Sequence, residues 1–175
     1  MVSTKFFLEL ISRVIAKIGS VLKPSGSVVA AVPYDRKVDR EYYDQVAEGW
    51  RNKGAKIGVN VRITQDLDHI NPHLIEIGNQ CVVGGFILTH GPQDDLKPVV
   101  VGSGVYIGWN AIILPGVTIG DDCMIGAGAV VTRNVESGCV VGGNPAKKLR
   151  DITFDEKERF RMQMDCDRFI GAVPR

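Results

Sequence analysis

Residues 101–135 read VGSGVYIGWNAIILPGVTIGDDCMIGAGAVVTRNV, and an aliphatic residue recurs in this stretch at every sixth position. The six aliphatic residues are Val101, Ile107, Ile113, Ile119, Ile125 and Val131. Glycine follows four of them directly, and the residue four positions further on is always apolar and of small or medium size. A regular internal period of this kind determines the architecture before any single residue is interpreted.

The period excludes a helix and favours a stack of short strands. In an α-helix, residues six apart are turned by about 240°, so the aliphatic residues would point in three directions. Each glycine in a helix interior also costs about 1 kcal/mol relative to alanine. In extended chain, the aliphatic residue and the residue four further on face the same side, and we expect the glycine after the aliphatic residue to form a corner with positive φ. Such units bury their apolar faces only by stacking into a solenoid.

This run resembles the hexapeptide-repeat acyltransferases, in the branch that acetylates glycans and sugars. Similar segments are GGNPAK at 142–147, PHLIEIG at 72–78 and ILTHG at 87–91, so the resemblance spans about residues 55–150. It implies a mainly β fold, a left-handed parallel β-helix with a triangular cross-section in which each hexad contributes one face. Left-handedness is implied by the family and not by the period.

We expect three parts: an N-terminal helical segment at 1–54, the β-helix acyltransferase domain at 55–150, and a C-terminal helix and tail at 151–175. Tyr42, Tyr43, Val46, Ala47 and Trp50 recur at helical spacing and predict core contacts from a helix over 39–52 that Gly54 ends. The residues TFDE at 153–156 predict a capping box that opens a helix running to about Phe169. Loops at 64–73 and 90–98 interrupt the repeats, and we expect the terminal helices to cap the solenoid.

Composition and charge argue against nucleic-acid binding and against a transmembrane protein. The chain has 21 basic and 20 acidic side chains among 175 residues, which gives no bulk charge to attract nucleic acid. Its four cysteines form neither a CxxC pair nor a metal-binding spacing, so we expect buried, reduced thiols and a cytoplasmic protein. Residues 6–22 form an amphipathic helical stripe, but Glu9, Arg13 and Lys17 argue against a transmembrane segment or a signal peptide. We expect this stripe to pack on the protein's own trimer; docking onto a membrane surface or a partner is the alternative.

His90 is the candidate catalytic residue. The resemblance implies that a histidine in this loop is the general base, which removes a proton from the acceptor as it attacks the thioester of acyl-CoA. Imidazole is largely neutral yet accepts protons near neutral pH. A carboxylate that orients the ring is sought at Asp94 or Asp95, although each alone is also a common turn residue.

The other two histidines raise a different hypothesis. His69, His73 and His90 together would form a three-histidine zinc site, as in the γ-class carbonic anhydrases, which share this fold. However, the central repeats that carry the ligands in that enzyme contain no histidine here. A third hypothesis is a non-catalytic β-helical scaffold.

The resemblance also implies a site for acetyl-CoA, with no metal expected. The predicted groove residues are Gly126, Ala127, Gly128, Thr132, Arg133, Lys147, Lys148 and Arg150, in which the four cations would hold phosphates. For the acceptor, the predicted contacts are Asp68, His69, Asn71 and Trp109. Tyr106 and Trp109 depart from the family pattern, and a structural role is the alternative for Trp109.

Together these features predict a homotrimeric, acetyl-CoA-dependent acetyltransferase. Its acceptor would be a hydroxyl or amine of a sugar or nucleotide sugar, as in polysaccharide biosynthesis, and its active sites would lie between subunits.

Overall fold

The structure, a computed structural model, describes residues 36–91 and 96–164. The predicted helix over 6–22, Asp94, Asp95 and Cys166 lie outside these residues. The described chain begins with α2 (Arg36–Asn52) and continues through thirteen short strands to α3 (Phe154–Met164). The strands are β1 (Lys56–Ile57), β2 (Arg62–Ile63), β3 (Ile75–Ile77), β4 (Val82–Val83), β5 (Phe86–Ile87), β6 (Val99–Val101), β7 (Tyr106–Ile107), β8 (Ile112–Ile113), β9 (Thr118–Ile119), β10 (Met124–Ile125), β11 (Val130–Val131), β12 (Cys139–Gly142) and β13 (Lys147–Asp151).

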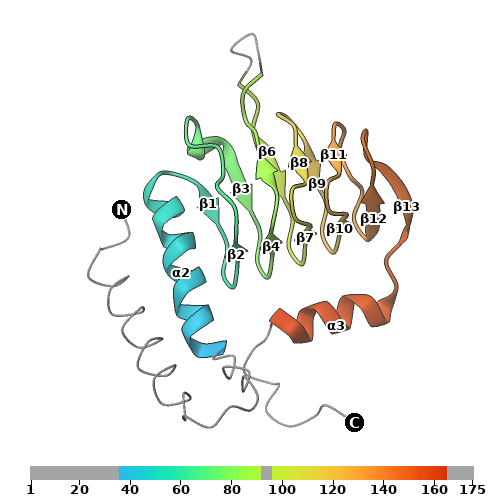
Figure 1. Cartoon of the computed structure of the whole chain (residues 1–175), viewed down its shortest axis with the longest axis horizontal. Coiled ribbons are helices and arrows are strands. Elements are labelled where there is room, and N and C mark those ends of the chain that lie inside the picture. The colour runs from blue at the N-terminus through green and yellow to red at the C-terminus, as the bar shows by residue number, and fades with distance from the viewer. Residues whose placement is uncertain (1–35, 92–95, 165–175) are drawn as a thin grey trace, which may run out of the picture.

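These strands form the three faces of a parallel β-helix (Figure 1). The first sheet has the order β1-β3-β6-β9, the second β13-β12-β10-β7-β4-β2, and the third β11-β8-β5. All pairings between these strands are parallel except that of β12 with β13. Consecutive strands of one coil pass to different sheets, and each strand pairs with its equivalent in the next coil. The predicted mainly β solenoid is confirmed.

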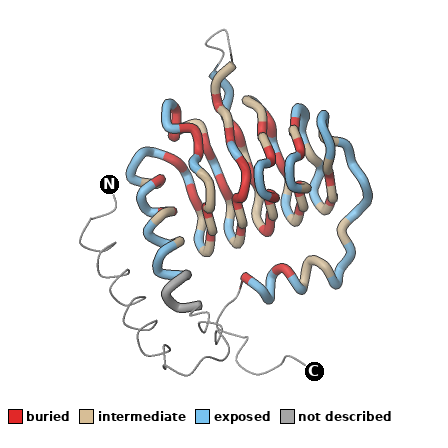
Figure 2. The backbone as a smooth tube through the Cα atoms, viewed as in Figure 1, coloured by how far each residue is buried: buried red, intermediate tan, exposed pale blue. Residues whose placement is uncertain are grey.

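The core is the inside of this solenoid, where equivalent aliphatic residues stack from coil to coil. Val101 pairs with Ile119, and Ile107 with Ile125, one 18-residue turn later. All six repeat-defining residues are buried, and the buried positions alternate with outward ones along each coil (Figure 2). Complete burial of such a side chain contributes about 1.5–3 kcal/mol. The predicted register and core are therefore confirmed.

The corners differ from the expectation in one respect. Positive φ occurs three residues after an aliphatic residue and not directly after it: the corner residues are Gly104, Asn110, Gly116, Asp122 and Gly128. The glycine directly after the aliphatic residue has a different purpose. A Cβ on Gly78 would lie 2.7 Å from the carbonyl oxygen of Gly102 in the next coil. Glycine is needed there because neighbouring backbones approach too closely for a side chain.

The helix α2 covers the first coil of the solenoid, which contains β1 and β2. It begins at Arg36, three residues before the predicted start, and packs against β1 and β2. Ala47 and Trp50 are buried as predicted, but Tyr42 is 41% exposed and meets Tyr43 edge-on, so its predicted core position is wrong. The Arg51 guanidinium donates to the backbone carbonyls of Ile57, at 2.8 Å, and Gly58. These bonds satisfy carbonyl groups at the open end of the solenoid.

The other end is closed by a strand and not by α3. The exposed strand β13 pairs with β12 and presents charged side chains, which protect a free sheet edge. The helix α3 starts at the predicted capping box, in which the Thr153 amide donates to Glu156 at 3.0 Å. It then runs back beneath the coils (Figure 1). Its Phe160 ring packs 6.1 Å from Tyr106, and the Met164 carbonyl accepts from Asn60 Nδ2 at 2.8 Å. The predicted extension to Phe169 lies outside the described residues.

Cys81, Cys123 and Cys139 are free and buried at inward positions, as predicted. Burial raises the pKa of the Cys81 thiol to about 11. Separately, within residues 36–91 and 96–164, neither helix has the length and apolar character needed to cross a membrane.

The close approach of neighbouring coils predicts the effect of two glycine substitutions. We expect Gly78→Ala to lower the free energy of unfolding by about 1–3 kcal/mol, because the backbone at Gly102 must move. Gly49 lies in α2, where a Cβ would meet no neighbouring group within 4 Å, and Gly49→Ala should raise stability by up to about 1 kcal/mol. Urea unfolding at equal protein concentration measures both. Equal effects of the two changes would contradict this account of the corners.

Candidate active site

His90 lies where the chain leaves the third sheet. It follows β5 by three residues, and an isolated antiparallel bridge joins it to Leu96. The Lys97 amide donates to the Thr89 carbonyl at 2.9 Å. The predicted loop at 90–98 is therefore closed at its base. His90 is held at the edge of the solenoid with 40% of its side chain exposed.

The partner of His90 comes from the loop between β2 and β3, residues 64–74. Asp68 Oδ2 lies 2.8 Å from His90 Nδ1 and also accepts from the Thr89 amide at 2.9 Å and the Thr89 hydroxyl at 2.6 Å. The other oxygen, Oδ1, accepts from the Ile70 amide at 2.9 Å. Only 2% of the Asp68 side chain is exposed. A buried carboxylate thus receives four hydrogen bonds, three of them at one oxygen.

These contacts determine the protonation of the pair. Burial raises the pKa of Asp68, but the hydrogen bonds from Thr89, Ile70 and His90 together lower it by more than burial raises it. The pKa of Asp68 therefore lies well below the ordinary value. An ionised carboxylate can only accept hydrogen bonds. Nδ1 of His90 must therefore carry a proton, and Nε2 of the neutral ring has the free lone pair. Among the described residues Nε2 has no hydrogen-bond partner. The ring is set up to accept a proton.

The three histidines do not come together. The His69 ring packs 5.0 Å from the Trp50 ring, and its Nε2 lies 3.6 Å from Asp66. His73 is exposed in the short 3-10 helix η1 (Pro72–Leu74). In the part of the chain that the structure describes, no three His, Cys, Asp or Glu side chains form a group that could hold a metal ion. The three-histidine cluster of the zinc hypothesis is not formed.

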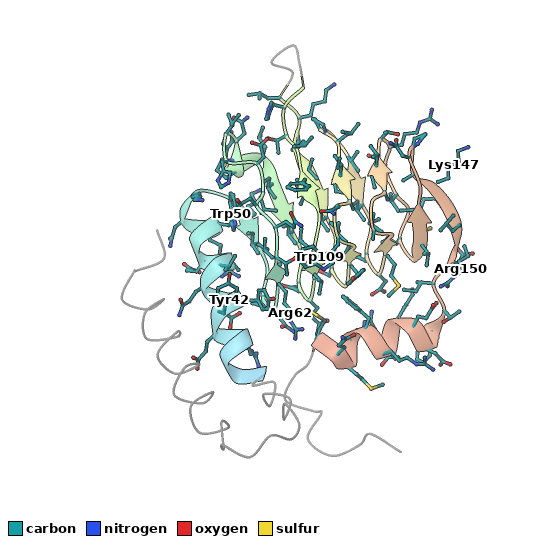
Figure 3. The ribbon with its side chains drawn as sticks, viewed as in Figure 1. Tyr42, Trp50, Arg62, Trp109, Lys147 and Arg150 are labelled. Carbon is teal, nitrogen blue, oxygen red and sulfur yellow. The ribbon has the colours of Figure 1, made fainter. Side chains whose placement is uncertain are left out.

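Two further predicted acceptor residues come from different loops. Asn71 precedes η1 in the Asp68 loop; it is buried, and its Nδ2 has no hydrogen-bond partner among the described residues. Trp109 is 58% exposed at the corner between β7 and β8 (Figure 3). Its backbone carbonyl accepts from the Gly128 amide of the next coil at 2.9 Å. Tyr106 packs on Phe160 and has a structural role.

The predicted acetyl-CoA residues divide into two groups. Gly126, Ala127 and Gly128 form the corner before β11, and Thr132 and Arg133 are exposed just after it. Among the four cations, Lys148 pairs with Asp151 at 2.7 Å and Arg150 binds both oxygens of Glu156, which lowers the pKa of Glu156 to about 2. Arg133 and Lys147 are exposed and have no ion pair within residues 36–91 and 96–164. Figure 3 labels Lys147 and Arg150 along β13.

The link between Asp68 and His90, which are 22 residues apart, was not predicted from the sequence. Asp68 was predicted as an acceptor contact, and the predicted orienting carboxylate was Asp94 or Asp95, which lie outside the described residues. One signal was present: both residues lie in loops that interrupt consecutive coils. Thr89, which directly precedes His90, supplies two of the four donors to Asp68.

Comparisons with known proteins agree with the sequence motifs. Residues 98–133 match the model of the bacterial transferase hexapeptide family (six repeats). Protein CapG of Staphylococcus aureus is 37% identical over 118 residues, covering 58% of this chain and 69% of that protein. Galactoside O-acetyltransferase of Escherichia coli K12 is 40% identical over 116 residues, covering 59% of this chain and 57% of the enzyme. A chloramphenicol acetyltransferase of Agrobacterium fabrum is 46% identical over 80 residues, covering 43% of this chain and 38% of the enzyme.

The chain thus spans between about a third and two thirds of the length of these curated relatives. Among solved structures, a galactoside acetyltransferase in complex with coenzyme A has a TM-score of 0.45 at 28% identity, covering 58% of this chain and 56% of that one. A hexapeptide-repeat acetyltransferase from Vibrio cholerae has a TM-score of 0.49 at 20% identity, covering 67% of this chain and 92% of that one.

The charge of Asp68 predicts a pH-dependent stability. Asp68→Asn should lower the free energy of unfolding at pH 7 by about 1–3 kcal/mol, because an amide cannot accept all these donors. A carboxylate whose folded pKa is lowered contributes stability above its unfolded pKa of about 3.9 and loses it as the pH falls below that value. The difference between wild type and variant should therefore shrink between pH 5 and pH 3 in urea unfolding. Asp66→Asn, at an exposed position of the same loop, is the control; a difference independent of pH would contradict the prediction.

Proposed function

This chain belongs to the hexapeptide-repeat transferase family, and on that premise we propose that it transfers an acetyl group from acetyl-CoA to a hydroxyl or amine. The observation that carries the proposal is the 2.8 Å contact between Asp68 and His90, which leaves Nε2 free to accept a proton. The acetyltransferases among its relatives support the same chemistry.

In the proposed reaction, His90 Nε2 takes the proton of the acceptor hydroxyl or amine while that atom attacks the thioester carbonyl carbon. A bond forms between the acceptor atom and the acetyl carbon, and the carbon–sulfur bond breaks. The departing CoA thiolate then receives the proton from the imidazolium. Asp68 holds Nδ1 throughout and stabilises the imidazolium, as the carboxylate does in other His–Asp pairs. Positioned general-base catalysis contributes about 10²- to 10⁴-fold.

For acetyl-CoA we propose the corner at 126–128, whose small residues let an extended pantetheine chain lie against backbone, together with Thr132. Arg133 and Lys147 are the better phosphate ligands of the four predicted cations, because each is exposed without an ion pair among the described residues. Lys148 and Arg150 are already neutralised within the chain. We assign these two to the stability of β13 and α3.

For the acceptor we propose a sugar or nucleotide sugar, supported by the galactoside O-acetyltransferase relative. Asn71, whose buried amide nitrogen has no partner among the described residues, and Trp109, with its exposed indole, are the acceptor contacts in this proposal. Asp68 has both oxygens occupied, so we assign it to the support of His90. The chloramphenicol acetyltransferase relatives favour a second acceptor class, chloramphenicol and compounds like it. Turnover of a panel containing both classes decides between them.

A homotrimer is part of the proposal. The outward residues of the third sheet, Phe86, Ile112 and Val130, stack in register as an apolar column. The helix α2 packs on β1 and β2 and α3 lies against Tyr106 of the second sheet, so neither is placed on this column. Exposed apolar faces of this kind mark interfaces. His90 follows β5 and the corner at 126–128 precedes β11, so the two lie at opposite ends of the third-sheet strands. Packing of a second copy would bring one end near the other.

Replacement of the imidazole tests the catalytic assignment. We expect His90→Ala to reduce kcat for thiol release from acetyl-CoA by about 10²- to 10⁴-fold with the best acceptor, because the group that accepts the proton is removed. His73→Ala, an exposed histidine in η1, should leave turnover unchanged. Sedimentation of each variant checks that assembly is retained. Full turnover in a folded, assembled His90→Ala protein would refute the assignment.

Enzyme kinetics can separate the cations proposed to bind acetyl-CoA from those that stabilise the fold. Arg133→Ala and Lys147→Ala should each raise KM for acetyl-CoA about tenfold with little change in kcat, because a charge-assisted bond to phosphate is lost. Arg150→Ala should instead loosen α3, which is seen as a lower unfolding midpoint with KM unchanged. An elevated KM in Arg150→Ala alone would reverse the assignment.

A further inference from the structure

The loop that supplies the orienting carboxylate is not part of any sheet. Residues 64–74 leave the solenoid after β2 and return at β3, so Asp68 has no position in a strand ladder. Its hydrogen bonds to Thr89 and His90 tie it to the second coil on one side. The residues beside Asp68 hold the loop from the other side.

The residues that flank Asp68 provide this second anchor. Leu67 is buried in the core, and the His69 ring packs against Trp50 with the ring centroids 5.0 Å apart and the ring planes inclined by 39°. Trp50 is itself buried near the end of α2 (Figure 3), where the Lys53 ammonium lies 4.1 Å from its ring centroid. The indole is therefore a fixed surface, and the His69 ring packs on it.

From this chain of contacts we infer that His69 is a positioning residue: its packing on Trp50 holds the 64–74 loop so that Asp68 orients His90. The inference rests on the proposed general-base role of His90. It makes α2, which lies outside the repeats, a support of the active site. It also assigns His69 a role that depends on its ring and not on its nitrogens, in contrast to direct contact with the acceptor.

Kinetics of ring-removing and ring-retaining variants test this inference. His69→Ala should lower kcat about 10- to 100-fold with KM for acetyl-CoA unchanged, because small misplacements of a catalytic group cost rates of this size. His69→Phe, which keeps a flat ring on Trp50, should retain kcat within about threefold of wild type. In an Asp68→Asn background, His69→Ala should add less than about twofold, since both changes act on the same orientation of His90. His73→Ala is the matched control in the same loop region.

A second readout does not depend on turnover. The chain has three histidines, so an untagged variant with His69→Phe and His73→Ala leaves His90 as the sole imidazole in a nitrogen-15 NMR spectrum. We expect the Nδ1–H tautomer there and a mixture of tautomers in the matched protein with His69→Ala and His73→Ala. The inference is overturned if His69→Phe is as impaired as His69→Ala, if the two changes multiply in the Asp68→Asn background, or if the tautomer is the same in both proteins. Retained activity in His90→Ala would instead refute the proposed function, while the tautomer experiment would still decide the positioning role.

Discussion

The backbones of neighbouring coils approach too closely for a Cβ at glycines that directly follow an inward aliphatic residue, and this stacking is the constraint on which the rest of the molecule depends. Strands of two or three residues have no stability alone. They exist because each inward residue rests on its equivalent one turn later, as Ile107 rests on Ile125. A glycine such as Gly78 is needed for that distance, and the positive-φ residue two positions later turns the chain to the next face. The interior is accordingly aliphatic, so reactive side chains come from the loops and corners that interrupt the repeats.

The same stacking explains how Asp68 meets His90. One loop leaves the second sheet after β2 and the other leaves the third sheet after β5, but both rejoin the first sheet in neighbouring strands, β3 and β6. The loops therefore meet, although 22 residues separate the two side chains. The solenoid thus converts two insertions into one site, in which Thr89 donates from the rigid second coil to a carboxylate from the first. The carboxylate stays ionised because its four donors outweigh the effect of burial on its pKa.

The sequence predicted well what depends on a repeating local pattern. The hexad period identified the strands and the inward positions, and the TFDE motif identified the start of α3. The role of His90 as the base comes from the family resemblance and stays a prediction. What it missed depends on distant neighbours. Tyr42 shares the helical spacing of Trp50, but only the latter is buried where α2 meets the first coil. Lys148 and Arg150 resemble free cations until the hairpin brings Asp151 and Glu156 to them. The role of glycine directly after each aliphatic residue was misassigned for the same reason: the backbone that excludes a Cβ belongs to another coil.

In the proposed trimer, the distribution of features over the three faces would make a single chain an incomplete enzyme. The first sheet has the charged outward residues Lys56 and Glu76, which pair with each other at 3.3 Å. The second is occupied by α3 through the contact of Phe160 with Tyr106. The third presents the apolar column, and its two edges carry the imidazole and the glycine corner proposed for acetyl-CoA. In the proposed trimer, association through the apolar column would bring the glycine corner of one copy towards the imidazole of the next. Burial of the third face and completion of the site would then occur together.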